Sequence, residues 1–274
     1  MSPVTTSVGH MDRIDVIDRE ARRFAETLSS GDPAARVPTC PEWDARALLW
    51  HLTGVHRFWA DVLAQDPQTE EEVGALEQEG IQPPGSIEEI LPLRAAATAD
   101  LLAQLRVLSD DEPRWSWWDT DQTVGFTRRM QTYEATMHRI DAELTAGTEV
   151  SAIEPDVAAG AIDQCVDVMW GWMADWSTYE ATAVVELVAA DTGQRWPVEI
   201  GHWFGVGPES GNTFDMARAV RAADGAVPTG TVTGVVEQLS RWAWGRQPQP
   251  GAIAIEGADD AVAAVRRLID QGIQ

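Results

Sequence analysis

Residues 123–147 read TVGFTRRMQTYEATMHRIDAELTAG. Large apolar side chains recur in this segment at every third or fourth position, which places them on one face of an α-helix. We therefore predict a long helix from about residue 123 to residue 146, ended by Gly147. The face that it buries against a core consists of Phe126, Met130, Tyr133, Met137, Ile140 and Leu144.

Two residues with metal-binding chemistry follow the margin of this apolar face. Glu134 and His138 are separated by four positions, so the helix places them about 40° apart and one turn apart along its axis. Asp141 continues the same line three positions later. Helical bundles direct ligands into an internal cavity in this way. The same spacing also occurs in ordinary pairs on a helix surface, so both interpretations stay open at this point.

A second predicted helix carries another histidine on the edge of its apolar face. This helix begins at the N-cap Asp44 and runs to about residue 64, and His51 lies between the apolar positions Leu48 and Val55. Two imidazoles and one carboxylate are a common ligand set for a catalytic divalent metal with an open position. A lone histidine at such a position is also compatible with a hydrogen-bonded residue of the core.

The other polar residues near these helices have less definite roles. Metal-bound histidines usually donate their second ring nitrogen to an acceptor, and Asp141 is a candidate for this role or for binding substrate. His56 lies about 140° around the second helix from His51, so the two do not easily share a metal. His10 and His202 have no partner nearby in the sequence.

The predicted fold class is mainly α, with a helical-bundle domain over residues 1–180 followed by a small α+β domain over residues 181–274. Further helices of the first domain are expected at about residues 10–29, 86–109 and 155–178, with a surface loop at 66–85. In the second domain the patterns predict strands at 182–189, 196–200 and 252–255, and helices at 231–243 and 259–269. Pro197 indicates an edge strand.

Composition excludes several classes of function. The 274 residues include 20 basic and 44 acidic side chains, a net charge of −24, so nucleic acid and anionic membrane are poor partners. All basic residues are arginine, which excludes a Schiff-base lysine, a pyridoxal-phosphate lysine and a phosphate-loop lysine. No apolar run is long enough to span a bilayer and no signal-peptide pattern is present, so we expect a cytoplasmic protein without a membrane partner.

The two cysteines have no feature of a reactive or disulfide-bonded pair. Cys40 and Cys165 have neither a C-x-x-C partner nor a neighbouring histidine in the sequence, so nothing visible lowers their pKa. The 13 tryptophans are compatible with an aromatic-walled cavity and equally with large core residues.

Several stretches resemble one known family. The segments VPTCPEWDARALLWHL (37–52) and YEATMHRIDAELTAG (133–147) are similar to the N-terminal signatures of the mycothiol-dependent maleylpyruvate isomerase family, in the DinB-like metalloenzyme superfamily. The segments TGTVTGVVEQLSRWAWGR (229–246) and IAIEGADDAVAAVRRLI (253–269) resemble its small C-terminal domain. The resemblance implies a DinB-like four-helix bundle and a divalent metal, normally zinc. It implies His51, Glu134 and His138 as the metal ligands, and Arg246 as an arginine facing the active site.

The resemblance also implies a thiol chemistry, with mycothiol as the cosubstrate. A metal that binds a small thiol stabilises the thiolate, which can then attack an electrophilic small molecule. The expected reaction is maleylpyruvate-type cis–trans isomerisation or mycothiol S-transfer, by a monomer or homodimer. Arg246 would bind a substrate carboxylate, although a surface ion pair is the alternative. A metal-hydroxide hydrolase and a non-enzymatic module that binds a small ligand are the alternative functions.

Overall fold

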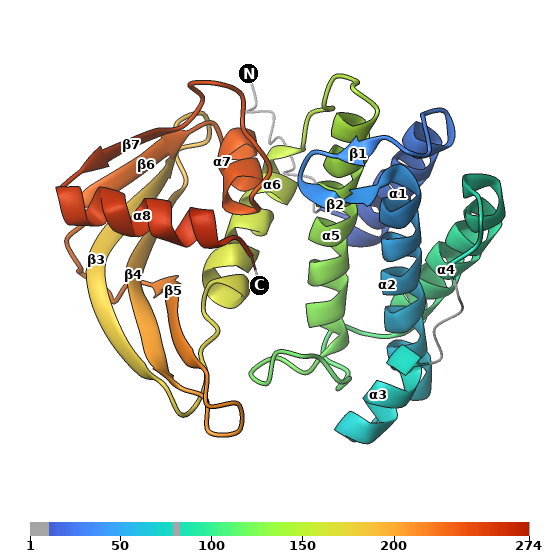
Figure 1. Cartoon of the computed structure of the whole chain (residues 1–274), viewed down its shortest axis with the longest axis horizontal. Coiled ribbons are helices and arrows are strands. Elements are labelled where there is room, and N and C mark those ends of the chain that lie inside the picture. Colours follow the sequence, from blue (N-terminus) through green and yellow to red (C-terminus); the bar gives the residue numbers. More distant parts are fainter. Residues whose placement is uncertain (1–10, 79–82, 274) are drawn as a thin grey trace, which may run out of the picture. The chain divides into compact units, whose positions relative to one another are not determined.

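The computed structural model describes residues 11–78 and 83–273. The chain divides into two units, residues 1–150 and residues 151–274, which are drawn in Figure 1. The sequence predicted this division at residue 180, which lies inside strand β3 (Thr178–Ala189). The boundary differs because helix α6 (Pro155–Gln164) packs against helix α7 (Val236–Ala243) of the second unit. No helix in the described ranges is long and apolar enough to cross a membrane.

The described part of the first unit is built on four long helices, as the sequence predicted for this region. Helix α1 packs against α4 and α5, and α2 also packs against both. Each of the four begins at a residue whose side chain accepts hydrogen bonds from the first turn, which satisfies backbone N–H groups that have no partner within the helix. The helices are α1 (Arg13–Ser29), α2 (Ala45–Gln65), α4 (Ile87–Val107) and α5 (Val124–Thr145).

Apolar faces of these helices form the core of the first unit. One cluster joins Leu48 and Leu52 of α2 to Phe24 of α1, and a second joins Trp59 to Leu101 of α4. Full burial of one such leucine or phenylalanine stabilises the fold by about 1.5–3 kcal/mol. The helical periodicity therefore predicted most of these core positions, although Val55 of α2 and Leu144 of α5 are only half-buried.

Two smaller elements of the first unit were not predicted. Residues expected to form a loop contain the short hairpin β1 (Arg36–Val37) and β2 (Cys40–Asp44) and, further on, helix α3 (Glu70–Gln78). A capping box begins α3, because Thr69 Oγ1 accepts from the N–H of Glu72 while Glu72 Oε2 accepts from that of Thr69. The T-x-x-E pattern at these positions is a sequence signal for this helix.

The described part of the second unit contains a five-stranded sheet, in the order β5-β4-β3-β6-β7. Strands β3, β4 and β5 are antiparallel, β6 pairs with β3 in parallel, and β7 pairs with β6 in antiparallel orientation. Figure 1 shows helix α8 (Asp259–Gln271) lying across the sheet, with contacts to several strands. The strands not yet given bounds are β4 (Arg195–Val206), β5 (Thr213–Arg221), β6 (Gly230–Gly234) and β7 (Ala254–Gly257).

The structure corrects three predictions in this unit. The helix predicted at 155–178 ends as α6 and a π-helical turn at Cys165–Met169, before the chain enters β3. The helix predicted at 231–243 begins only at Val236, because the preceding β-branched residues pair with β3 as strand β6. Strand β4 lies inside the sheet and not at its edge, and Pro197 is tolerated there because pairing with β5 begins at the next residue, Val198.

Candidate active site

Helix α5 places Glu134, His138 and Asp141 on one line, as the spacing predicted. His138 Nε2 lies 3.1 Å from Glu134 Oε2, and His138 Nδ1 lies 2.9 Å from Asp141 Oδ2. The His138 side chain is 7% exposed and that of Asp141 is fully buried, whereas Glu134 is only half-buried. The arrangement is therefore a hydrogen-bonded cluster at the edge of the core and not a pair on the helix surface.

Helix α2 brings a third predicted residue to this cluster. The ring centroid of His51 lies 4.9 Å from that of His138, and the two ring planes meet at 71°. On its other side the His51 ring lies 4.6 Å from the indole of Trp43, which precedes the N-cap of α2. The contact between α2 and α5 therefore brings His51 close to His138, two residues of the ligand set that the sequence analysis had suggested.

Asp141 orients His138 and is itself held in place. Asp141 Oδ1 accepts a hydrogen bond of 2.7 Å from Thr39 Oγ1, and Thr39 lies between strands β1 and β2. Burial of the His138 ring disfavours its charged form, but the hydrogen bonds and charges of Asp141 and Glu134 outweigh this effect and raise the pKa of His138 to about 9. Thr39 was missed by sequence reasoning, because no local pattern links it to a residue of α5.

The donor chemistry of the cluster fits a divalent metal of the zinc type. Two imidazoles and a carboxylate match the ligand set of a catalytic zinc site. Because Asp141 contacts Nδ1 of His138, the nitrogen of His138 that could bind a metal is Nε2. As the side chains stand, Glu134 and His138 form an ion pair with each other. In the described ranges no group of three or more histidine, cysteine, aspartate or glutamate residues is arranged to hold a metal ion. The match to a zinc site therefore rests on the types of the donor atoms and on the closeness of His51, Glu134 and His138.

Two of the other histidines, His56 and His202, have different partners in the described part of the chain. His56 is fully buried and turns toward α4, where its Nδ1 lies 3.3 Å from Thr98 Oγ1. Burial, with the nearby charges of Arg94 and His138, lowers the pKa of His56 well below its usual range. His202 is on β4, where it pairs with Asp215, and His10 lies outside the described residues.

The second unit contains the predicted arginine and a buried cysteine. Arg246 follows Gly245, whose φ of 70° turns the chain after α7, and Arg246 Nη1 donates to the carbonyl oxygen of Trp244. Burial raises the pKa of the Cys165 thiol well above its ordinary value, although the charge of Arg246 acts in the opposite direction. A raised pKa is the opposite of what an activated thiol requires, in agreement with the sequence analysis of Cys165.

A comparison with family models assigns the first unit. Residues 14–143 match the model described as the mycothiol maleylpyruvate isomerase N-terminal domain. This part of the chain is therefore similar to the N-terminal domain of the mycothiol maleylpyruvate isomerase family. The matched range runs from α1 into the last turn of α5 and includes His51, Glu134 and His138. This family is named for an enzymatic activity, which supports an enzymatic role for the chain.

Solved structures support the same fold. A crystal structure of the mycothiol-dependent maleylpyruvate isomerase is 14% identical in sequence, with a TM-score of 0.57. A histidine-to-alanine variant of a mycothiol-dependent maleylpyruvate isomerase is 13% identical, with a TM-score of 0.58. Each comparison covers 89% of this chain and 92% of the other. No curated protein matches the sequence.

Proposed function

We propose that this enzyme uses a low-molecular-weight thiol, mycothiol, as a nucleophile toward an electrophilic small molecule. The reaction would be cis–trans isomerisation of a maleylpyruvate-type substrate or transfer of mycothiol to the substrate. The observation that carries the proposal is the convergence of His51, Glu134 and His138 within the domain that matches the family model. We also infer that the four long helices form a DinB-like four-helix bundle around these residues.

A divalent metal, zinc by the donor set, would be held by His51, Glu134 and His138. When bound, such a metal supplies a Lewis acid that lowers the pKa of a thiol bound beside it. The chain itself keeps His138 in one orientation, because the buried Asp141 accepts from Nδ1 and Thr39 fixes Asp141. These contacts favour a single position for the ligating nitrogen, which a catalytic site requires.

A thiol from outside the chain fits the buried state of Cys165. The pKa of Cys165 is raised by burial, so this residue stays protonated at neutral pH and is a poor nucleophile. In an isomerisation the external thiolate would add to the activated double bond, the resulting single bond would rotate, and the thiolate would leave. In a transferase the adduct would instead be released.

Arg246 is proposed to bind the carboxylate of the substrate. Its guanidinium can hold a carboxylate through two parallel hydrogen bonds, and lysine, the other possible cation, does not occur in this chain. Because the protein carries a net charge of −24, an anionic electrophile would need a dedicated cation such as Arg246 to hold it.

Metal content and thiol dependence together test the proposal. The purified protein should contain one divalent metal per chain, and His138→Ala should lose most of it while remaining folded by circular dichroism. His202→Ala, which removes a histidine of β4, is the matched control and should keep its metal. Turnover of a maleylpyruvate-type substrate should stop when the thiol is omitted. Undiminished turnover without thiol would contradict the proposal and favour a metal-hydroxide hydrolase.

A further inference from the structure

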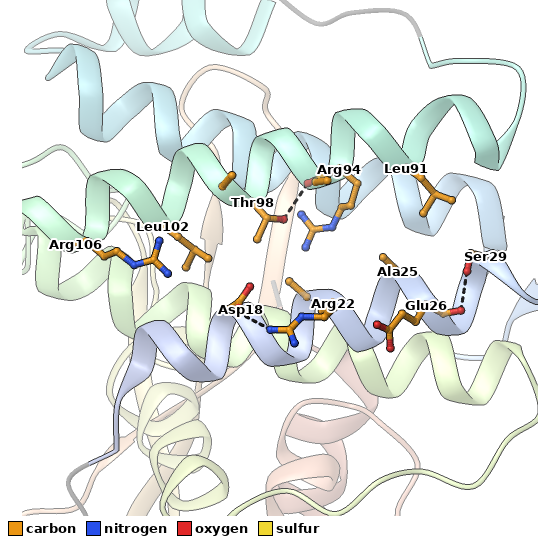
Figure 2. Close-up of a pocket in the computed structure, with 13 residues that line it drawn as sticks. Asp18, Arg22, Ala25, Glu26, Ser29, Leu91, Arg94, Thr98, Leu102 and Arg106 are labelled. Carbon is orange, nitrogen blue, oxygen red and sulfur yellow. Dashed lines mark hydrogen bonds and ion pairs between the residues drawn. The ribbon is translucent and has the colours of Figure 1, made fainter.

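A groove runs between helices α1 and α4 of the first unit (Figure 2). Its volume is about 480 Å³, within the range of pockets that hold small organic ligands. Small apolar side chains form its walls, among them Ala21 and Ala25 from α1 and Ala95 and Ala99 from α4. None of the candidate metal ligands lines this groove, so it is a separate feature of the unit.

Arg94 lines the groove as a buried cation that forms no ion pair with any residue in the described ranges. The residue is only 2% exposed, and its Nη1 donates to the carbonyl oxygen of Leu52 at 3.2 Å. Its Nε and Nη2 have no hydrogen-bond partner among the residues that the structure describes. The ring centroid of Phe24 lies 5.5 Å from Cζ. A buried charge with unsatisfied donors is costly, which points to a partner that the chain itself does not supply.

The charged groups along the groove do not provide this partner. Asp18 pairs with Arg22 at 2.5 Å, one turn apart on α1. Glu26 also lines the groove, but its side chain is exposed and forms no ion pair with Arg94. Burial lowers the pKa of Arg94 to about 9, which leaves the guanidinium protonated at neutral pH. The floor of the groove therefore stays positive, although the protein as a whole is strongly acidic.

The two unpartnered nitrogens define the chemistry of the missing group. In a planar guanidinium, Nε–H and one N–H of Nη2 lie along the same edge and point in the same direction, a spacing that matches the two oxygens of a carboxylate. Figure 2 shows the guanidinium of Arg94 directed from α4 toward α1, into the space between the helices. A side-chain rotation of the kind that commonly accompanies binding would present this edge to a ligand in the groove.

We propose that the α1–α4 groove binds an organic monocarboxylate with an apolar body. The carboxylate would accept from Nε and Nη2 of Arg94, and the apolar body would lie along the alanine walls. Phosphate alone lacks the apolar body, and a neutral alcohol lacks the charge. The site does not depend on the proposed metal or thiol chemistry, since it shares no residue with it.

Calorimetric titration of the full-length protein with octanoate tests this site. We expect one octanoate per chain, with acetate, phosphate and 1-octanol each binding at least about tenfold more weakly. Arg94→Lys keeps the positive charge but removes the pair of parallel N–H donors at Nε and Nη2. It should therefore weaken octanoate binding by about tenfold or more. Arg106→Gln is the matched control, because this exposed arginine lines the same groove, and it should change the affinity less than about twofold.

A second variant keeps the test decisive if Arg94→Lys does not fold. Ala99→Trp places a large ring in the groove from an exposed position and should abolish octanoate binding without altering the core. The proposal is overturned if octanoate does not saturate the protein by about 10 mM. It is overturned equally if binding survives Ala99→Trp, or if phosphate binds as tightly as octanoate.

Discussion

Replacing Asp141 with asparagine isolates the contribution of one buried carboxylate to the proposed metal site. Asp141 is fully buried and contacts His138 Nδ1 at 2.9 Å and Thr39 Oγ1 at 2.7 Å. Asparagine keeps the shape and one acceptor oxygen, so the change removes mainly the negative charge behind the His138 ring. Loss of such a partner lowers metal affinity by about 10- to 100-fold. This corresponds to about 1.4–2.7 kcal/mol.

The retained acceptor places the expected effect of Asp141→Asn near the lower end of that range, at about tenfold. Thr39→Val leaves the contact between Asp141 and His138 intact and removes only one hydrogen bond to the carboxylate, so its effect should be smaller, at about threefold. The exposed Glu149 supplies the control, because Glu149→Gln makes the same change of charge in the same unit at an exposed position. The control should bind metal like the unaltered protein.

Competition with a chromophoric chelator at constant pH measures the zinc affinity of all four proteins. Circular dichroism of the metal-free forms shows whether each variant is folded. The reasoning predicts the order unaltered protein, Glu149→Gln, Thr39→Val, Asp141→Asn, from tightest to weakest, with the first two equal. A folded Asp141→Asn protein with unchanged zinc affinity would refute the role assigned to this carboxylate, as would an equal loss in Glu149→Gln.

Three further predictions concern the core, the cysteines and the unit boundary. Arg139→Met should lower the free energy of unfolding, measured by urea denaturation, by about 3–5 kcal/mol. The reason is that Arg139 is 1% exposed and pairs at 2.8 Å with two carboxylates, one on α1 and one on α5. A loss below about 1 kcal/mol would contradict this prediction. The double variant Cys40→Ser, Cys165→Ala should keep most of its thiol-dependent turnover, and a complete loss in the folded protein would implicate a cysteine. A fragment of residues 151–274 should show a cooperative thermal unfolding transition. A fragment of residues 181–274 should not, because it lacks α6, which packs against α7. Cooperative unfolding of both fragments would favour the boundary at residue 180.

Local patterns predicted the parts of this protein that depend on neighbouring residues. The 3.6-residue period of apolar side chains indicated the long helices, and Asp44 was correctly identified as an N-cap. The line of Glu134, His138 and Asp141 follows from helix geometry alone, so the distances between them were expected. Local patterns gave a wrong prediction where the same residues are compatible with both a helix and a strand. The residues before Val236 have the apolar spacing of a helix, but their β-branched side chains favour strand β6.

The sequence by itself thus determined the helical character of the first unit, the spacing of the candidate ligands on α5, and the exclusion of lysine-dependent chemistry. Only the tertiary structure decided that His51 of α2 lies beside His138 and that Thr39 of the hairpin holds Asp141. It also decided that Arg94 is buried beside a groove with no ion-pair partner in the described part of the chain. The physical reason is that helix periodicity specifies which residues share a face. Which faces meet depends on packing between segments far apart in the chain, and no local pattern records it.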